Sequence, residues 1–233
     1  MKFFLSKNGI EYYYTDKFLY AKKKGQAKPY KLALFDKHFY KLRLYNRVPI
    51  LEIDGLRMQL VKDFKSPLDY SKEITSRLRI GKNDLALDTC MGLGYTAIAA
   101  AKYAQKVITC ELSNAVLQLA KWNPFSSDLF AGNNIELKQG DVASIITGFK
   151  DKTYDVVIHD PPRFSHAPHL YSSQFYSELF RVTKSKARLF HYVGSIGKES
   201  GRKIENEVGK RLEAVGFRSI KFEARLQGLF FNR

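Results

Sequence analysis

The segment Leu85-Ala86-Leu87-Asp88-Thr89-Cys90-Met91-Gly92-Leu93-Gly94-Tyr95-Thr96 decides the fold of this 233-residue chain. It starts as a short apolar strand, continues through two glycines, and leads into a run of small residues, Ala97 to Ala101, that is typical of a helix. Glycine lets the backbone turn tightly and lets a ligand approach closely, because it has no side chain in the way. A strand, a glycine loop and a helix in this order predict a cofactor cradle at the edge of a parallel sheet.

The next predicted strand ends in an acid that fits such a cradle. Glu111 stands 17 residues beyond Gly94, where a carboxylate can accept hydrogen bonds from both hydroxyls of a ribose, so we expect a cofactor that contains adenosine. The glycine spacing also satisfies the GxGxxA form of nicotinamide-binding proteins, and by itself it leaves the cofactor open. Asp88 favours S-adenosylmethionine (SAM), since a carboxylate attracts its cationic amino acid portion and would repel a pyrophosphate.

Strands and helices alternate from residue 66 to the end of the chain. Ser66-Pro67 predicts the start of a helix, because serine is a good N-cap and proline suits the first helical position. Such alternation predicts an α/β domain with a mostly parallel, Rossmann-like sheet over residues 66–233. Strands are expected at 85–89, 107–111, 135–137, 154–159, 187–193, 219–223 and 227–231, and helices at 66–78, 96–103, 113–121, 172–183 and 203–215.

Residues 1–65 predict a small, basic, β-rich domain with an antiparallel sheet. Apolar and polar residues alternate in segments such as Tyr40 to Tyr45, and turn signals such as Asn8-Gly9 separate these segments. The segment holds 15 Lys and Arg against six Asp and Glu, and the whole chain has a formal net charge of +16. We therefore expect a polyanionic partner, RNA first, which this domain would contact. A soluble basic surface and an ordinary aromatic core are the simpler interpretation.

A second motif follows the strand expected at 154–159. The sequence there reads Tyr154-Asp155-Val156-Val157-Ile158-His159-Asp160-Pro161-Pro162-Arg163-Phe164. The apolar strand is typical of a buried one, and Asp-Pro-Pro stands at its carboxyl end, where α/β sheets bind ligands. We expect Asp160, Pro161 and Pro162 to form the catalytic centre.

Residues 84–193 resemble the class I SAM-dependent methyltransferases, and among them the enzymes with a (Asp/Asn/Ser)-Pro-Pro-(Tyr/Phe) motif that act on exocyclic amines of nucleobases. The basic β-rich N-terminal segment and the run Arg188 to Gly194 also resemble an archaeal-type group of RNA methyltransferases. The resemblance implies SAM as the cofactor, with Glu111 on the ribose and Asp141 on the adenine amine. The full set of implied cofactor-binding residues is Asp88, Cys90, Gly92, Gly94, Thr96, Glu111, Leu112, Asp141, Val142 and Asp160.

The implied reaction is methylation of an exocyclic amine of an RNA base, with N4 of cytidine in ribosomal RNA as the first expectation. Arg163 stands where an aromatic residue usually follows the second proline, so the stacking aromatic would be displaced by one position to Phe164. Arg163 suits a phosphate or a nearby carboxylate. His191 and Tyr192 suit a substrate pocket or a structural role. The implied substrate-contacting residues are Arg163, Phe164, His191 and Tyr192.

Nitrogen methylation requires mainly that the amine be aligned with the methyl group. We expect the Asp160 carboxylate and the Pro161 carbonyl to accept hydrogen bonds from the amine. A paired base cannot reach such a pocket, so the target would be single-stranded or flipped out. Methylation of a ring carbon needs a cysteine nucleophile, and it is disfavoured because Cys90 lies in the cofactor loop and Cys110 within a strand.

Several alternatives stay open. The amine could be N2 of guanosine or N6 of adenosine in tRNA, or could belong to a protein or a small molecule. A nicotinamide-dependent oxidoreductase would leave Asp-Pro-Pro without a role, and a non-catalytic RNA-binding or assembly factor could retain SAM binding.

The remaining features argue against metal, export and membrane functions. Two cysteines form neither a disulfide framework nor a zinc pattern, and the histidines at 159, 166 and 169 have no metal-ligand spacing. The apolar run at residues 1–5 is too short for a signal peptide, and no segment approaches the roughly 20 apolar residues that span a bilayer. We expect a cytoplasmic protein without metal.

Overall fold

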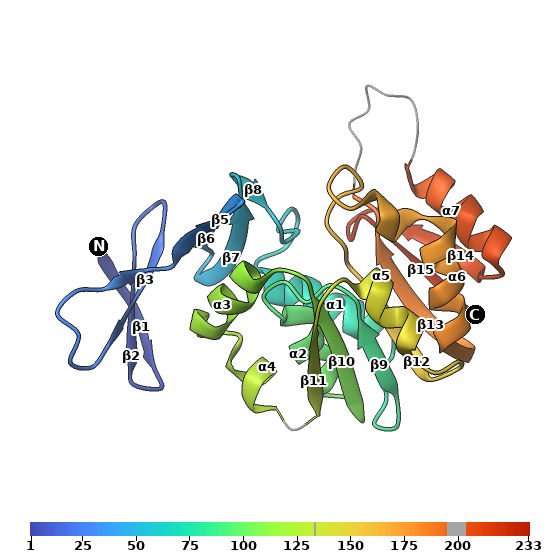
Figure 1. Ribbon diagram of the computed structural model, residues 1–233, viewed down its shortest axis with the longest axis horizontal. Helices are drawn as coiled ribbons and strands as arrows, with labels where there is room; N and C mark the ends of the chain where they lie inside the picture. Colours follow the sequence, from blue (N-terminus) through green and yellow to red (C-terminus); the bar gives the residue numbers. More distant parts are fainter. Residues whose placement is uncertain (133, 195–203) are drawn as a thin grey trace.

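The computed structural model describes residues 1–132, 134–194 and 204–233 (Figure 1). Its main feature is a seven-stranded sheet in the order β11-β10-β9-β12-β13-β15-β14. The first five strands pair in parallel, whereas β15 pairs antiparallel with both β13 and β14. The expected α/β fold with a mostly parallel sheet is confirmed. The strands are β9 (Leu85–Asp88), β10 (Lys106–Glu111), β11 (Ile135–Gln139), β12 (Tyr154–His159), β13 (Thr183–Tyr192), β14 (Arg218–Glu223) and β15 (Gly228–Asn232).

Helices cover both faces of this sheet, because successive residues of a strand point to opposite sides. Ala86 and Val156 pack with residues of α1, α2 and α3, while Leu87 and Val157 pack with residues of α5, α6 and α7. The helices are α1 (Pro67–Arg77), α2 (Tyr95–Ala101), α3 (Asn114–Trp122), α4 (Ser127–Ala131), α5 (Val142–Ile145), α6 (Ser173–Val182) and α7 (Ile204–Val215), with 3₁₀ turns η1 (Ile146–Gly148) and η2 (Pro168–Tyr171).

Serine caps explain where three helices begin. The hydroxyls of Ser66, Ser113 and Ser172 each accept a hydrogen bond from a backbone N–H in the first turn of α1, α3 and α6. Such a cap satisfies one of the free N–H groups at a helix start. The short helices α4 and α5 were not expected, because four or five residues carry too little periodicity to be recognised. The expected start of the last helix at 203 lies outside the described residues.

The N-terminal region contains two four-stranded antiparallel sheets rather than the single sheet expected. The chain passes from one to the other at Leu32, which is fully buried and hydrogen-bonded to both Leu19 and Leu42. One buried residue therefore ends the first sheet and begins the second. The first sheet comprises β1 (Lys2–Lys7), β2 (Ile10–Tyr14), β3 (Leu19–Lys23) and β4 (Tyr30–Lys31), and the second β5 (Ala33–Asp36), β6 (His38–Tyr45), β7 (Val48–Ile53) and β8 (Leu56–Arg57).

Side chains of both N-terminal sheets contact the α/β region. In the first sheet, Tyr30 stacks on Trp122 of α3 with 5.9 Å between ring centroids. In the second, the carbonyl of Pro49 accepts a hydrogen bond of 2.7 Å from the hydroxyl of Tyr95, the first residue of α2. The second sheet is therefore fixed beside the glycine loop that precedes α2.

Two further observations concern the described part of the chain. None of its helices combines the length and apolar composition needed to cross a bilayer. It also brings together no group of three His, Cys, Asp or Glu side chains able to hold a metal ion.

Candidate active site

A cavity of about 260 Å³ lies where the carboxyl ends of β9, β10, β11 and β12 meet the second N-terminal sheet. The loops that follow these four strands form one side. The other side comes from the N-terminal segment and from α1, through Leu51, Ile53, Met58, Gln59, Pro67, Tyr70 and Ser71. This edge of a parallel sheet is the usual ligand-binding edge of an α/β fold.

The two glycines of the loop after β9 serve different purposes. Both have left-handed backbone angles, with φ of +55° at Gly92 and +79° at Gly94, which glycine adopts without strain. A Cβ at Gly94 would lie 2.8 Å from a methyl carbon of Leu129, so this glycine is required by packing against α4. A Cβ at Gly92 would meet only the Gln59 amide nitrogen, at 3.8 Å. Gly92 therefore leaves space on the cavity side.

Glu111 is fixed at the end of β10 by two backbone N–H groups. Its Oε2 accepts a hydrogen bond from Gly92 N at 2.9 Å, and its Oε1 accepts one from Ser113 N at 2.8 Å. Burial raises the pKa of Glu111 to about 7, although these hydrogen bonds lower it. Each carboxylate oxygen has a second lone pair, so the half-buried side chain can still accept hydrogen bonds from a bound ligand.

Asp88 does not reach the cavity directly. Its side chain is fully buried, and its two oxygens accept hydrogen bonds from Thr96 Oγ1 at 3.1 Å and Thr109 Oγ1 at 2.6 Å. Burial raises the pKa of Asp88 to about 6, against the effect of the two threonines. Asp88 therefore lies behind the cavity and supports it through Thr96, which lines it, and a contact of Asp88 with the cofactor stays a prediction.

Asp141 forms the third acidic position, after β11. Its side chain caps α5 by accepting a hydrogen bond from Ala143 N at 2.9 Å. His169 Nε2, on η2, lies 3.6 Å from Asp141 Oδ1. Both Asp141 and His169 line the cavity, so the segment after Asp160 closes over this end of it.

Asp160 and Tyr70 lie next to each other in the cavity lining. Burial raises the pKa of Asp160 to about 7, the Asp88 carboxylate adds to the rise, and the Tyr70 hydroxyl lowers it. Tyr70 is 3% exposed, and its hydroxyl makes no hydrogen bond within the described part of the structure. Burial raises the pKa of Tyr70 well above its usual range. The hydroxyl therefore stays protonated beside Asp160 as an unused donor.

Buried polar contacts fix the backbone on both sides of Asp160. His159 is fully buried, and its Nε2 lies 3.0 Å from the carbonyl of Leu170, while its Nδ1 lies 2.7 Å from Thr89 Oγ1. A carbonyl can only accept, so Nε2 carries the proton and Nδ1 accepts from Thr89. Burial lowers the pKa of His159 to about 3, which keeps the ring neutral. Beyond Asp160, the Tyr171 hydroxyl donates to the carbonyl of Pro162 at 2.9 Å.

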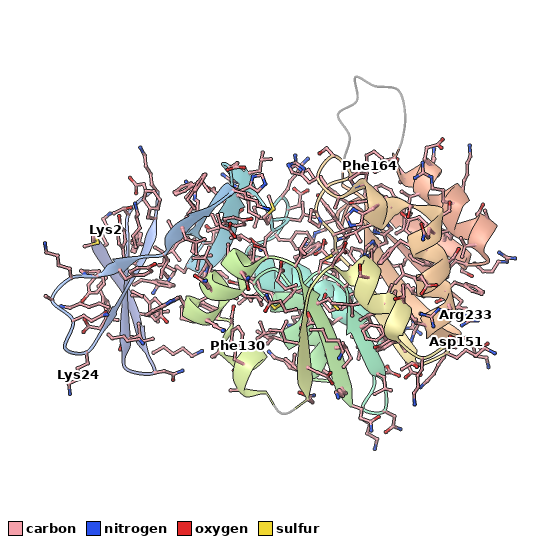
Figure 2. All side chains as sticks on the ribbon, viewed as in Figure 1. Lys2, Lys24, Phe130, Asp151, Phe164 and Arg233 are labelled. Atoms are coloured by element: carbon pink, nitrogen blue, oxygen red, sulfur yellow. The ribbon has the colours of Figure 1, made fainter. Side chains whose placement is uncertain are left out.

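The four residues expected to contact the substrate do not line the cavity. His191 is fully buried, and its Nε2 lies 2.9 Å from the Tyr176 hydroxyl, which favours the structural role of the two that the sequence left open. Phe164 is 42% exposed and packs edge-on against Tyr171 at the margin of the molecule (Figure 2). Arg163 is exposed and lies near Tyr192: burial raises the pKa of Tyr192, and the Arg163 cation offsets part of that rise.

Comparison with known proteins agrees with this geometry. Residues 86–186 match the family model described as "Methyltransferase domain". An uncharacterized protein of Methanocaldococcus jannaschii is 46% identical over 204 residues, which cover 87% of this chain and 69% of the relative. The chain is a class I SAM-dependent methyltransferase.

More distant relatives of the methyltransferase include a Clostridium acetobutylicum protein named as an RNA methyltransferase, 36% identical over 37% of this chain and 18% of that protein. Another M. jannaschii protein, named for N5-glutamine methylation, is 28% identical over 48% of this chain and 54% of its own length.

Solved structures show the same fold. Spermidine synthase from Thermotoga maritima superposes with a TM-score of 0.66 over 89% of this chain and 76% of its own, at 17% identity. A SAM-dependent methyltransferase from Aquifex aeolicus superposes with a TM-score of 0.51 over 70% of this chain and 87% of its own, at 20% identity. At these identities the likeness concerns the fold alone.

The cavity of the methyltransferase fits its cofactor. The bare Gly92 backbone leaves room on the cavity side, and the Glu111 carboxylate is fixed with lone pairs free to accept hydrogen bonds from a ribose. Acidic side chains also suit a cationic sulfonium. Of the residues expected to bind SAM, those that line the cavity are Cys90, Gly92, Thr96, Glu111, Leu112, Asp141, Val142 and Asp160, whereas Asp88 and Gly94 lie behind it. Which of them contact the cofactor stays a prediction.

Sequence reasoning missed the side of the cavity formed by the N-terminal segment and α1. Gln59, Tyr70 and Ser71 are its polar members, and none of them belongs to a recognisable motif. The aliphatic run of β7, Val48 to Leu51, is typical of a buried strand, but it does not tell which strand of the second sheet lies beside the glycine loop. The direction of α1, which places Tyr70 beside Asp160, is also a tertiary property.

Proposed function

We propose that this methyltransferase methylates an exocyclic amine of an RNA base, with N4 of cytidine in ribosomal RNA as the first candidate. The observation that carries the proposal is the position of Asp160-Pro161-Pro162, which lines the same cavity as Glu111 and Asp141. A carboxylate and the backbone that follows it thus line the same cavity as residues suited to hold the cofactor, which supports the proposal.

SAM, when bound, supplies an electrophilic methyl group. The chain then has to hold the amine with its lone pair directed at that group. The Asp160 carboxylate and the Pro161 carbonyl would each accept one hydrogen bond from the amine, and the carboxylate would stabilise the positive charge that develops on nitrogen. The contacts of His159 and Tyr171 hold this backbone on both sides, so the acceptors are positioned before the substrate arrives.

The N-terminal sheets support an RNA substrate. Exposed lysines are distributed over this region, while Phe3, Tyr30 and Phe35 are 52–75% exposed. Figure 2 shows Lys2 and Lys24 on the outer part of the first sheet, far from the C-terminal end of the chain. Cations attract phosphates and exposed aromatic rings can stack on bases. The exposed lysines of the N-terminal region are Lys2, Lys7, Lys17, Lys23, Lys24, Lys28, Lys31, Lys37, Lys62 and Lys65.

The state of the two cysteines favours nitrogen over ring carbon as the methyl acceptor. Cys90 and Cys110 both line the cavity as free thiols. Burial raises the pKa of Cys90 well above its usual range and that of Cys110 to about 12. Only a thiolate attacks a pyrimidine ring. Protonated thiols fit an enzyme that needs no cysteine nucleophile.

The decisive experiment is mass spectrometry of nucleosides from the RNA of cells with and without this protein. Complementation uses the intact chain and the Asp160→Ala variant. Loss of one N-methylated nucleoside that only the intact chain restores would identify both the base and the reaction. If every RNA nucleoside is unchanged, the proposal fails. A protein amide or amine would then be the next candidate, which the distant relative named for N5-glutamine methylation favours.

A further inference from the structure

The acidic cavity leaves one group of the cofactor without an obvious partner. Glu111, Asp141 and Asp160 all line it, and Asp88 lies directly behind the glycine loop. These carboxylates suit the sulfonium and the ammonium of SAM. The amino acid portion of SAM also carries a carboxylate, which needs a hydrogen-bond donor. The question is which side chain of the cavity can provide that donor.

Most side-chain hydroxyls that line the cavity are already engaged. Ser71 Oγ donates to the carbonyl of Pro67 at 3.0 Å, and the Tyr95 hydroxyl donates to Pro49 O. Thr96 donates to Asp88, and Thr89 Oγ1 lies 2.7 Å from the acceptor nitrogen of His159. The Tyr70 hydroxyl is free but sits next to Asp160, which would repel a second carboxylate there.

Gln59 is oriented as a donor by the N-terminal sheet. Its Oε1 accepts a hydrogen bond from Leu51 N at 2.7 Å. The opposite amide orientation would place two N–H groups against each other, so this contact fixes which end is nitrogen. No hydrogen bond within the described part of the structure uses Gln59 Nε2. That nitrogen is 3.8 Å from the place a Cβ on Gly92 would take, and both residues line the cavity.

We infer that Gln59 binds the carboxylate of the SAM amino acid portion through its side-chain NH₂ group. The donor lies beside the glycine loop, where the methionine end of the cofactor is expected, and its own carbonyl is anchored to β7. The N-terminal segment is then part of the cofactor site as well as a candidate RNA surface. This inference does not depend on which amine accepts the methyl group.

The test compares two ligands with the full-length protein by calorimetry. S-adenosylhomocysteine carries the carboxylate, and decarboxylated S-adenosylhomocysteine lacks only that group. The variant is Gln59→Glu, which keeps an oxygen for Leu51 N and replaces the donor by a second acceptor. The dissociation constant for S-adenosylhomocysteine should rise about tenfold or more, as expected for loss of a hydrogen bond to a charged group. That for the decarboxylated ligand should stay within threefold.

Two further variants keep the result interpretable. Gln174→Glu makes the same change at an exposed position of α6 and should leave both affinities unchanged. Gln59→Met keeps the bulk of the side chain without any donor, and it serves if the glutamate variant is poorly folded. Equal losses for the two ligands would show that Gln59 only supports β7, and an unchanged affinity for S-adenosylhomocysteine would also overturn the inference.

Discussion

Glu111 Oε2 accepts a hydrogen bond from Gly92 N at 2.9 Å, which joins the end of β10 to the loop after β9. The same carboxylate also accepts from Ser113 N, at the start of α3. One acid therefore fixes the glycine loop and the next helix while it faces the cavity. Changes at Glu111 should affect both cofactor binding and local order.

Replacing Glu111 by alanine should raise the dissociation constant of S-adenosylhomocysteine about tenfold or more, because a charged hydrogen-bond acceptor is lost. Titration of the intact chain and the variant with S-adenosylhomocysteine and with its 2′-deoxyribose analogue measures this. If Glu111 binds the ribose, the variant should discriminate less between the two ligands. Equal discrimination by both proteins would contradict the assignment.

Asp160→Asn should lower the rate of methyl transfer roughly 100-fold or more, as for loss of a positioned group that stabilises developing charge. The pKa of Asp160 is raised to about 7, and the ionised form is the one that accepts from the amine. The rate for the intact chain should therefore rise with pH up to about 7 and then level off. A rate that is flat from pH 5.5 to 8.5 would argue against this role.

The stability of the cofactor-free protein should fall as the pH rises, whereas the rate of methyl transfer should increase. Glu111 and Asp160 have folded-state pKa values of about 7, above their ordinary values of 4.5 and 3.8. Between about pH 4 and pH 7 the native state therefore binds more protons than the unfolded state. The stabilisation that comes from protonating these two carboxyl groups is complete below about pH 4 and is lost as the pH rises through 7. Urea unfolding at pH 6 and pH 8 checks the sign, and Asp160→Asn should flatten the dependence.

Tyr70→Phe should change stability little, because the buried Tyr70 hydroxyl lies near Asp160 but outside normal hydrogen-bond geometry, and the ring stays packed on Phe64 and Phe190. Loss of the hydroxyl should raise the pKa of Asp160, since Tyr70 lowers it. The rise of activity with pH should then move to higher pH. Tyr154→Phe, at the amino end of β12 and outside the cavity, should leave the profile in place. A lower melting temperature for Tyr70→Phe with an unmoved profile would indicate a structural role only.

Changing Lys24 and Lys28 to alanine should weaken RNA binding and its dependence on salt. Both side chains are exposed in the N-terminal region. If each lysine contacts a phosphate, the plot of the logarithm of the RNA association constant against the logarithm of the salt concentration should become less steep by about one to two. The matched control removes Lys150 and Lys152, two exposed lysines near Asp151 on the other side of the molecule (Figure 2). Identical slopes for the two double variants would contradict a specific RNA-binding role of the N-terminal sheets.

The strands and helices were predicted well where the local pattern is strong. The strand 154–159 has the expected bounds, and Ser66 caps the helix that begins at Pro67. The glycine loop and Glu111 also meet as expected, because parallel strands bring their carboxyl ends to one edge. Asp88 was predicted to contact the cofactor, and His191 to contact substrate or to be structural; both side chains are fully buried and lie outside the cavity lining. The sequence alone does not tell that Thr96 and Thr109 hydrogen-bond to Asp88, or that Tyr176 hydrogen-bonds to His191.

The sequence by itself determined the α/β fold, the cofactor loop and the catalytic candidate Asp160, since each follows from local periodicity and from residues close in the chain. Only the tertiary structure decided that the N-terminal segment forms one wall of the cavity. Gln59 reaches it because Leu32 divides the N-terminal strands into two sheets and Tyr95 anchors the second sheet at Pro49, whereas Tyr70 comes from α1. Such contacts depend on packing between residues far apart in the chain, which no local pattern encodes.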